Sequence, residues 1–257
     1  MRIVITGAEG LIGGVLRLGL SDRFTLRALT RSPQEFPSAA VDVGDLAALV
    51  REFSSADAVV HLAAAADLDA PWPEVLRCNI EGTRNVYEAA RVAGVQRVVF
   101  ASSGHVIGLA EERAGPSLYA LHDPRVFDEH APYEPDSSYA ASKVYGEVLG
   151  RYYAEALGVG VICVRLGTVL PDDNPRTDRA GRGRSATMSY AERYPRVRAK
   201  WLSHRDCCHL FSQALTAKSV NYAVVFGTSD NPRQIWSLAG ARRRLGYQPQ
   251  DRAPVDA

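Results

Sequence analysis

The chain opens with MRIVITGAEGLIG, residues 1–13, and this stretch decides the fold. The short apolar run Arg2–Thr6 is typical of a buried strand, and three glycines follow it. Gly7 permits a tight turn, Gly10 lets the backbone approach a pyrophosphate, and Gly13 lets a helix pack closely on the strand. The first turn of that helix would offer unpaired N–H groups and a positive dipole end to phosphates. The expected dinucleotide-binding residues are Gly7, Gly10, Leu11, Ile12 and Gly13.

The rest of the first two-thirds of the chain alternates short β-branched runs with helical stretches. This alternation favours a parallel sheet with helices on both faces. The strand runs are nearly continuous in apolar residues, as expected for strands covered on both sides. We therefore expect a doubly wound α/β sheet of the Rossmann type, with helices that begin near Gly10, Asp45, Pro73 and Ser137. The predicted strands are Arg2–Thr6, Thr25–Leu29, Ala40–Asp42, Ala58–Leu62, Arg97–Ser102 and Val161–Leu166.

The C-terminal third has a different composition. From Pro171 to Lys200 the sequence is dominated by Arg, Asp, Pro and Gly, and its regular pattern fails. Two interpretations of this basic segment, 171–200, stay open: a solvated, partly disordered insertion, or a flap that closes over a substrate and supplies a cation. We expect one Rossmann-type domain over residues 1–257, in which residues 167–257 form a small C-terminal substrate-binding extension. Beyond the basic segment, we expect a helix over Trp201–Leu215, a strand over Tyr222–Gly227 and a helix over Gln234–Leu245.

Composition and charge argue against several classes of function. Of the 257 residues, 46% are hydrophobic and 23% are charged, as in an ordinary globular protein. The formal net charge of +1 gives no field that would recruit nucleic acid or an anionic membrane. No apolar run reaches the roughly 18 residues of a membrane span, and the first residues do not resemble a signal peptide. The four cysteines lack metal or redox spacing, so we expect reduced thiols, no metal site and a cytoplasmic location.

The residues after the second predicted strand bear on the type of dinucleotide. Many NAD enzymes carry an acidic side chain there, which accepts a hydrogen bond from the 2′-hydroxyl of the adenosine ribose. This chain has Thr30 and Arg31 instead, and both could bind a 2′-phosphate. We therefore expect NADP, with NAD as the alternative if Arg31 only stacks on the adenine or points into water. Near the end of the third strand, before Val43, Asp42 either accepts from the adenine amino group or caps the next helix.

A tyrosine and a lysine four residues apart predict the catalytic end. Tyr139 and Lys143 fall in YAASK near the start of a predicted helix, so their side chains share one helix face. A tyrosine with an unperturbed pKa of about 10 is a poor base at neutral pH, but a nearby ammonium group favours the phenolate. Lys143 can supply that charge and can also hold the nicotinamide ribose. The strand that ends in Ser102 and Ser103 provides a hydroxyl that could hold the substrate oxygen in line with Tyr139.

Five motifs, in order over residues 1–170, resemble the extended short-chain dehydrogenase/reductases: TGAEGLIG, HLAAAA, NIEGT, ASSGHVIG and YAASK. The resemblance implies a Rossmann fold and a nicotinamide cofactor. It selects Ser103, five residues before Gly108, as the catalytic serine. It also implies that Asn79 belongs to the cofactor site by bracing the active-site strands, and that His61 is a packed strand-end residue rather than a catalyst. The cofactor contacts implied by HLAAAA are Leu62, Ala63 and Ala64.

Within that family, the sequence is most similar to short sugar dehydrogenases that oxidise C1, the uronate dehydrogenases and related glucose-6-phosphate dehydrogenases. The shared segments, such as APWPEVLRCNIEGT, VRLGTV and WLSHRDCCHLF, cover nearly the whole chain. The resemblance implies that Arg196, five residues before Trp201, grips a substrate carboxylate. Gly104 replaces an asparagine and Ala66 replaces a serine of the uronate dehydrogenases, so a free or phosphorylated aldose stays open beside a uronate. The implied substrate-binding residues are Ala66, Ser103, Gly104, His105, Thr168 and Arg196.

Together the motifs predict an NAD(P)-dependent oxidoreductase that transfers hydride from C1 of a pyranose to the nicotinamide and gives a lactone. One alternative is a nucleotide-sugar epimerase or dehydratase, although such enzymes usually need a larger C-terminal region, and dehydratases carry an acidic pair where Gly104 and His105 stand here. A non-enzymatic alternative is a cofactor-sensing regulator of the same fold, a class that commonly loses the Tyr–Lys pair. The expected partners are a small sugar and further copies of the chain, in a homo-oligomer of two or more subunits.

Overall fold

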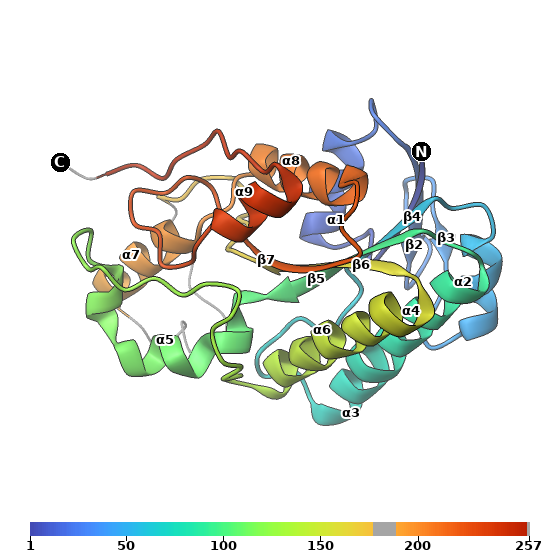
Figure 1. The fold of residues 1–257 in the computed structure, drawn as a ribbon, viewed down its shortest axis with the longest axis horizontal. Coiled ribbons are helices and arrows are strands. Elements are labelled where there is room, and N and C mark those ends of the chain that lie inside the picture. The colour runs from blue at the N-terminus through green and yellow to red at the C-terminus, as the bar shows by residue number, and fades with distance from the viewer. Residues whose placement is uncertain (177–188, 256–257) are drawn as a thin grey trace.

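The computed structural model describes residues 1–176 and 189–255 and contains one parallel sheet between two layers of helices (Figure 1). The strand order is β3-β2-β1-β4-β5-β6-β7, and every pairing is parallel. The strand order reverses between β1 and β4, so the sheet is doubly wound, as predicted. The strands are β1 (Arg2–Thr6), β2 (Thr25–Thr30), β3 (Ala39–Ala40), β4 (Ala58–His61), β5 (Arg97–Ser103), β6 (Gly160–Leu166) and β7 (Tyr222–Gly227).

The two faces of the sheet carry separate hydrophobic cores. On one face, α1 (Leu11–Gly19), α8 (His204–Thr216) and α9 (Ala239–Leu245) pack on residues such as Ile3 and Val225. The other face is covered by three further helices, which enclose Val59, Val98 and their neighbours (Figure 1). These strands are buried on both sides, which explains their continuous apolar runs. The helices of the second layer are α2 (Leu46–Phe53), α4 (Gly82–Val92) and α6 (Ser138–Leu157).

A third, smaller core lies beyond the carboxyl ends of the strands, around the buried ring of Trp236. In Figure 1, α5 and α7 lie at this end of the molecule. None of the helices in residues 1–176 and 189–255 combines the length and hydropathy needed to cross a membrane. The elements that complete the described chain are α3 (Trp72–Val75), the π-helix η1 (Leu76–Glu81), the 3₁₀ helices η2 (Gly104–Ile107) and η3 (Pro116–Tyr119), α5 (Gly108–Ala114) and α7 (Tyr190–Lys200).

Two predicted helix starts in the C-terminal third were wrong. The helix expected from Trp201 begins at His204, because the Ser203 side chain accepts a hydrogen bond from the Asp206 N–H and caps it. Trp201 instead forms a β-bridge with Thr168. The helix expected from Gln234 begins only at Ala239, because Trp236 forms a β-bridge with Phe127 and the Phe127 backbone bonds to Ile235 and Ser237.

The basic segment, 171–200, contains more regular structure than its composition predicted. Helix α7 covers Tyr190–Lys200, and it starts with a capping box in which Ser189 and Glu192 satisfy each other's backbone N–H groups. Pro195 lies inside this helix. Residues 177–188 lie outside the described part of the chain, so the choice between a solvated insertion and a flap stays open for them.

Candidate active site

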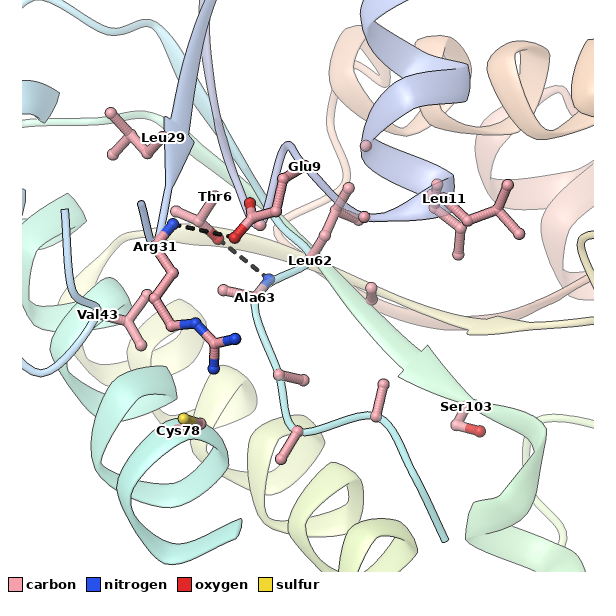
Figure 2. A pocket seen from close by; sticks show the side chains of 18 of the residues that line it. Thr6, Glu9, Leu11, Leu29, Arg31, Val43, Leu62, Ala63, Cys78 and Ser103 are labelled. Carbon is pink, nitrogen blue, oxygen red and sulfur yellow. Dashed lines mark hydrogen bonds between the residues drawn. The ribbon is translucent and has the colours of Figure 1, made fainter. Parts of the chain in front are cut away.

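A cleft of about 640 Å³ lies at the carboxyl ends of β1, β2, β5 and β6, where the glycine loop begins (Figure 2). In open parallel sheets, ligands bind in this crevice, next to the point where the strand order reverses. The glycine loop and the start of α6 both reach the cleft, so the cofactor and catalytic predictions meet in one place. The predicted cofactor residues that line it are Gly7, Gly10, Leu11, Ile12, Gly13, Thr30, Arg31, Asp42, Val43, Leu62, Ala63, Ala64, Tyr139 and Lys143.

The loop between β1 and α1 uses its glycines in two ways. Gly7 has a φ of +69°, and a Cβ there would lie 2.6 Å from the backbone nitrogen of Ala63. A Cβ at Gly13 would lie 2.7 Å from the backbone of Ala8. At Gly10, the N-cap of α1, a Cβ would meet only the Gly7 carbonyl oxygen, at 3.4 Å. Internal packing therefore explains Gly7 and Gly13, whereas the open space over Gly10 fits a pyrophosphate at the helix N-terminus.

The end of β2, where the adenosine ribose is expected, carries charges of both signs. The Thr30 hydroxyl donates to the Ser32 carbonyl at 2.9 Å. The Arg31 side chain is 71% exposed, and its Nη1 lies 3.9 Å from Glu74 Oε1. Glu9, which is absent from the predicted set, accepts a hydrogen bond from the Arg31 backbone N–H at 3.0 Å (Figure 2). The preference for NADP over NAD therefore stays a prediction.

Asp42 lines the cleft, and one of its two predicted roles is wrong. Asp45, not Asp42, caps α2, since Asp45 Oδ1 accepts from the Ala48 N–H at 2.9 Å. Asp42 Oδ1 accepts from the Gly44 N–H at 2.8 Å, and its Oδ2 accepts from Arg77 Nη1 at 2.7 Å. A contact between Asp42 and the adenine amino group stays a prediction.

Ser103 ends β5, and Tyr139 and Lys143 lie one turn apart on α6; all three line the cleft. Lys143 Nζ donates to the Ala101 carbonyl at 2.8 Å and lies 5.6 Å from the centroid of the Tyr139 ring. Burial raises the pKa of Tyr139, and its hydrogen bond with the Ser103 hydroxyl lowers it. Burial lowers the pKa of Lys143 to about 8. This arrangement can take up a proton from a substrate hydroxyl held by Ser103 and Tyr139.

Comparison with known proteins agrees with this geometry. Residues 3–189 match the NAD dependent epimerase/dehydratase family. The chain belongs to this family. It is 35% identical to an NAD-dependent glucose-6-phosphate dehydrogenase from Haloferax volcanii, in a match that covers 97% of this chain and 93% of the relative. It is 37% identical to an L-arabinose 1-dehydrogenase (NAD(P)(+)) from the same organism, over 97% of this chain and 96% of the relative.

Among solved structures, the fold resembles a mutant of uronate dehydrogenase from Agrobacterium tumefaciens complexed with NAD. The identity is 29%, the TM-score is 0.80, and the match covers 98% of this chain and 85% of that chain. Family membership and these relatives support an NAD(P)-type cofactor, and its place in the glycine loop and the cleft described above stays a prediction.

Asn79 and His61 are buried and are not among the residues that line the cleft. Asn79 Oδ1 accepts from the Ala65 N–H at 2.7 Å, and its Nδ2 donates to the Ser142 hydroxyl at 2.9 Å. Asn79 therefore joins the loop after β4 to α6 and does not line the cleft itself. His61 is 1% exposed, and burial lowers its pKa to about 3, which agrees with a packed neutral histidine bonded to Thr6.

The set of residues predicted from the sequence lacks a buried ion pair that lies near the predicted catalytic residues. Arg165 on β6 donates two hydrogen bonds to Glu147 on α6, at 2.9 and 2.8 Å, and both side chains are at most 1% exposed. Glu147 Oε1 also accepts from the Ser102 hydroxyl at 2.5 Å. Since Glu147 follows Lys143 by four residues, helical spacing was the signal that could have found it. The pair joins α6 to β6, and the Ser102 bond joins α6 to β5; α6 and β5 carry the predicted catalytic side chains.

Gly104 and His105 follow Ser103 in η2 but are not among the residues that line the cleft. Gly104 packs against the Trp236 ring so closely that an added Cβ would overlap it, which explains why no amide side chain stands there. His105 Nδ1 lies 2.6 Å from Asp136 Oδ2. Burial raises the pKa of Asp136, but the hydrogen bond and charge of His105, the Ser137 hydrogen bond and the Lys200 charge together leave the pKa of this carboxyl below its ordinary value.

Arg196, the predicted clamp, lies on α7 and does not line the cleft. Its Nη2 is 3.9 Å from Glu111 Oε2, which also accepts from Lys200 Nζ at 3.1 Å and from the Tyr119 hydroxyl at 3.0 Å. The local sequence around Arg196, YPRVRAK, does not indicate that Arg196 and Lys200 lie beside Glu111 and Tyr119. The remaining predicted substrate residues, Ala66 and Thr168, line the cleft.

Proposed function

We propose that the protein is an NAD(P)-dependent sugar dehydrogenase that oxidises C1 of a pyranose to a lactone. The observation that carries this proposal is the placement of Ser103, Tyr139 and Lys143 in the same cleft as the glycine loop. The three related proteins named above support the substrate class, since their names specify glucose-6-phosphate, L-arabinose and a uronate. The Tyr–Lys pair that a non-catalytic regulator commonly loses is retained here.

In this mechanism the protein supplies a base and two positioning groups. The C1 hydroxyl donates to Tyr139, whose phenolate takes its proton, while the Ser103 hydroxyl holds the same oxygen. The Ser103 hydrogen bond opposes the effect of burial on the Tyr139 pKa. The Lys143 ammonium, 5.6 Å from the centroid of the Tyr139 ring, is proposed to favour the phenolate. When bound, the nicotinamide accepts the hydride that leaves C1. Gly10 and the N-terminus of α1 would hold the pyrophosphate.

The charge of the sugar is the second part of the proposal. Arg196 is proposed to bind a carboxylate or phosphate, because a guanidinium group can donate two parallel hydrogen bonds to paired oxygens. To do so it must turn towards the cleft from Glu111, which lies 3.9 Å away, and from the Tyr119 hydroxyl. His105, hydrogen-bonded to Asp136, is proposed to contact the sugar. The preferred substrate would then be a uronate or a sugar phosphate rather than a neutral aldose.

Two further features belong to the proposal. The sequence at Thr30 and Arg31 favours NADP, whereas the carboxylates that line the same part of the cleft oppose a 2′-phosphate; the acceptor is therefore proposed as NAD or NADP. A homo-oligomer and a cytoplasmic location stay predictions.

The test measures the initial rate of reduction of the nicotinamide, which is followed by the absorbance of its reduced form. Glucuronate, galacturonate, glucose, L-arabinose and glucose-6-phosphate would each be assayed with NAD and with NADP. We expect at least one sugar to be oxidised, and Tyr139→Phe to lower its kcat by about 10²–10⁴-fold while NAD binding persists. Turnover at the parent rate by Tyr139→Phe would refute the mechanism. Interconversion of UDP-glucose and UDP-galactose without net reduction, and no oxidation of any sugar, would favour the epimerase class instead.

A further inference from the structure

The end of β2 lacks an acidic residue in the sequence, but the structure puts a carboxylate there. Glu9 lies in the glycine loop, between Gly7 and Gly10, and its side chain reaches across to β2. Its Oε1 accepts from the Arg31 backbone N–H at 3.0 Å, so the main chain at the end of β2 holds the carboxylate in the cleft (Figure 2). In NAD enzymes of this fold, a carboxylate at the end of β2 accepts a hydrogen bond from the ribose 2′-hydroxyl.

The two guanidinium groups at this end of the cleft are both next to carboxylates. Arg77 Nη1 donates to Asp42 Oδ2 at 2.7 Å, and Arg31 Nη1 lies 3.9 Å from Glu74 Oε1. Glu9 has no cationic side chain within ion-pair distance among the described residues. The cleft near β2 therefore holds three carboxylates against two guanidinium groups, and a 2′-phosphate would meet an excess of negative charge.

The hydroxyl that could have helped a 2′-phosphate is already in use. Thr30 is 1% exposed, and its Oγ1 donates to the Ser32 carbonyl at 2.9 Å. A hydroxyl has one proton, so Thr30 cannot donate to a phosphate without giving up that bond. Of the two residues that favoured NADP in the sequence, only the exposed Arg31 side chain stays available, and it would have to leave Glu74.

We infer that Glu9 takes the place of the missing acidic residue of β2 and makes NAD the preferred cofactor of this protein. Its carboxylate accepts from the 2′-hydroxyl of NAD and repels the 2′-phosphate of NADP. Glu9 is thus a specificity residue supplied by the glycine loop instead of by the second strand. This inference rests on the dinucleotide site of the proposed function, but not on the identity of the sugar.

The test measures the dissociation constants of NAD and NADP for the protein without any sugar, by isothermal titration calorimetry. The parent protein should bind NAD at least 10-fold more tightly than NADP. Glu9→Gln keeps an oxygen that can accept from the Arg31 N–H and removes only the charge, so the loop contact is preserved. This variant should lower the ratio of the two constants by about 10-fold or more, mostly through tighter NADP binding.

Two other variants separate the role of Glu9 from a general effect of charge. Asp22→Asn removes an exposed carboxylate that precedes Thr25, the first residue of β2, and so lies at the end of the strand opposite to the cleft. It should leave the ratio of the NAD and NADP dissociation constants unchanged. Glu74→Gln removes a carboxylate of the same cleft and should change the ratio less than Glu9→Gln does. Tighter binding of NADP by the parent, an unchanged ratio in Glu9→Gln, or a larger effect of Glu74→Gln would each overturn the inference. Because no sugar is present, these results are independent of whether the proposed C1 oxidation is correct.

Discussion

Substitution of Gly10 by alanine tests whether the glycine loop serves a ligand or only the fold. Gly10 has a φ of −71°, and a Cβ there meets nothing nearer than 3.4 Å, which is ordinary van der Waals contact. Gly10→Ala should therefore lower the free energy of unfolding by at most about 1 kcal/mol, the cost of a poorer N-cap residue. The same methyl group would occupy the space in which a pyrophosphate approaches the backbone. Loss of one charged hydrogen bond, worth about 1.5–3 kcal/mol, would weaken NAD binding by roughly 10–100-fold.

Gly7→Ala should behave in the opposite way, because its cost lies within the protein. Its φ of +69° strains any residue with a Cβ by about 1–2 kcal/mol, and overlap with the Ala63 backbone adds about 1–3 kcal/mol. Gly94→Ala is the matched control. Gly94 has a φ of +75°, but an added Cβ there meets nothing within 4 Å, so this variant has the backbone strain without the overlap. Urea unfolding and calorimetric NAD titration would be run on all three variants. If Gly10→Ala is as unstable as Gly7→Ala, or binds NAD like the parent, the explanation of the loop is refuted.

Four further outcomes are expected. Burial lowers the pKa of Lys143 from 10.5 to about 8. Since the unfolded chain keeps that proton up to pH 10.5, the contribution of Lys143 to stability should rise by up to about 3 kcal/mol between pH 8 and 10.5. In urea titrations the free energy of unfolding of Lys143→Met, relative to the parent, should therefore fall by this amount over the same pH range, and a constant difference would contradict the shift. Gly104→Asn must displace the Trp236 ring, so it should lower thermal stability by about 1–3 kcal/mol without a gain in sugar affinity; a stable variant would contradict this packing. Arg196→Met should reduce kcat/KM for an anionic sugar by roughly 10²-fold and for a neutral sugar much less, and equal losses would rule out the clamp. Glu147→Gln leaves a buried arginine without its counter-charge and should cost about 3–5 kcal/mol in unfolding experiments, whereas a loss below 1 kcal/mol would show that the pair is dispensable.

The fold was predictable because its signals are local. The strand Arg2–Thr6, the glycine loop and the cap at Ser137 lie within short windows, and each predicts the same element that the structure contains. The pair Tyr139 and Lys143 was predictable for the same reason, since four-residue spacing on a helix fixes a common face.

The remaining features depend on contacts between distant segments. Glu9 gains its significance only from the approach of its side chain to Arg31, and Gly104 only from Trp236, which lies far along the chain. The early start predicted for the helix at Trp201 failed because Trp201 pairs with Thr168 in a bridge that no local pattern shows. Composition also misled for Tyr190–Lys200, where a capping box starts a helix within an otherwise basic, Pro-containing segment.

The most direct test of the central claim uses a sugar that carries deuterium only at C1. With the best substrate of the panel and its preferred dinucleotide, the account predicts that the reduced nicotinamide gains one deuterium by mass spectrometry and that the sugar appears as a lactone. A primary isotope effect on kcat/KM is expected if hydride transfer limits the rate, and Tyr139→Phe should suppress both products together. Reduced nicotinamide without deuterium, or a sugar that retains its C1 label, would show that C1 is not the hydride donor and would contradict the account.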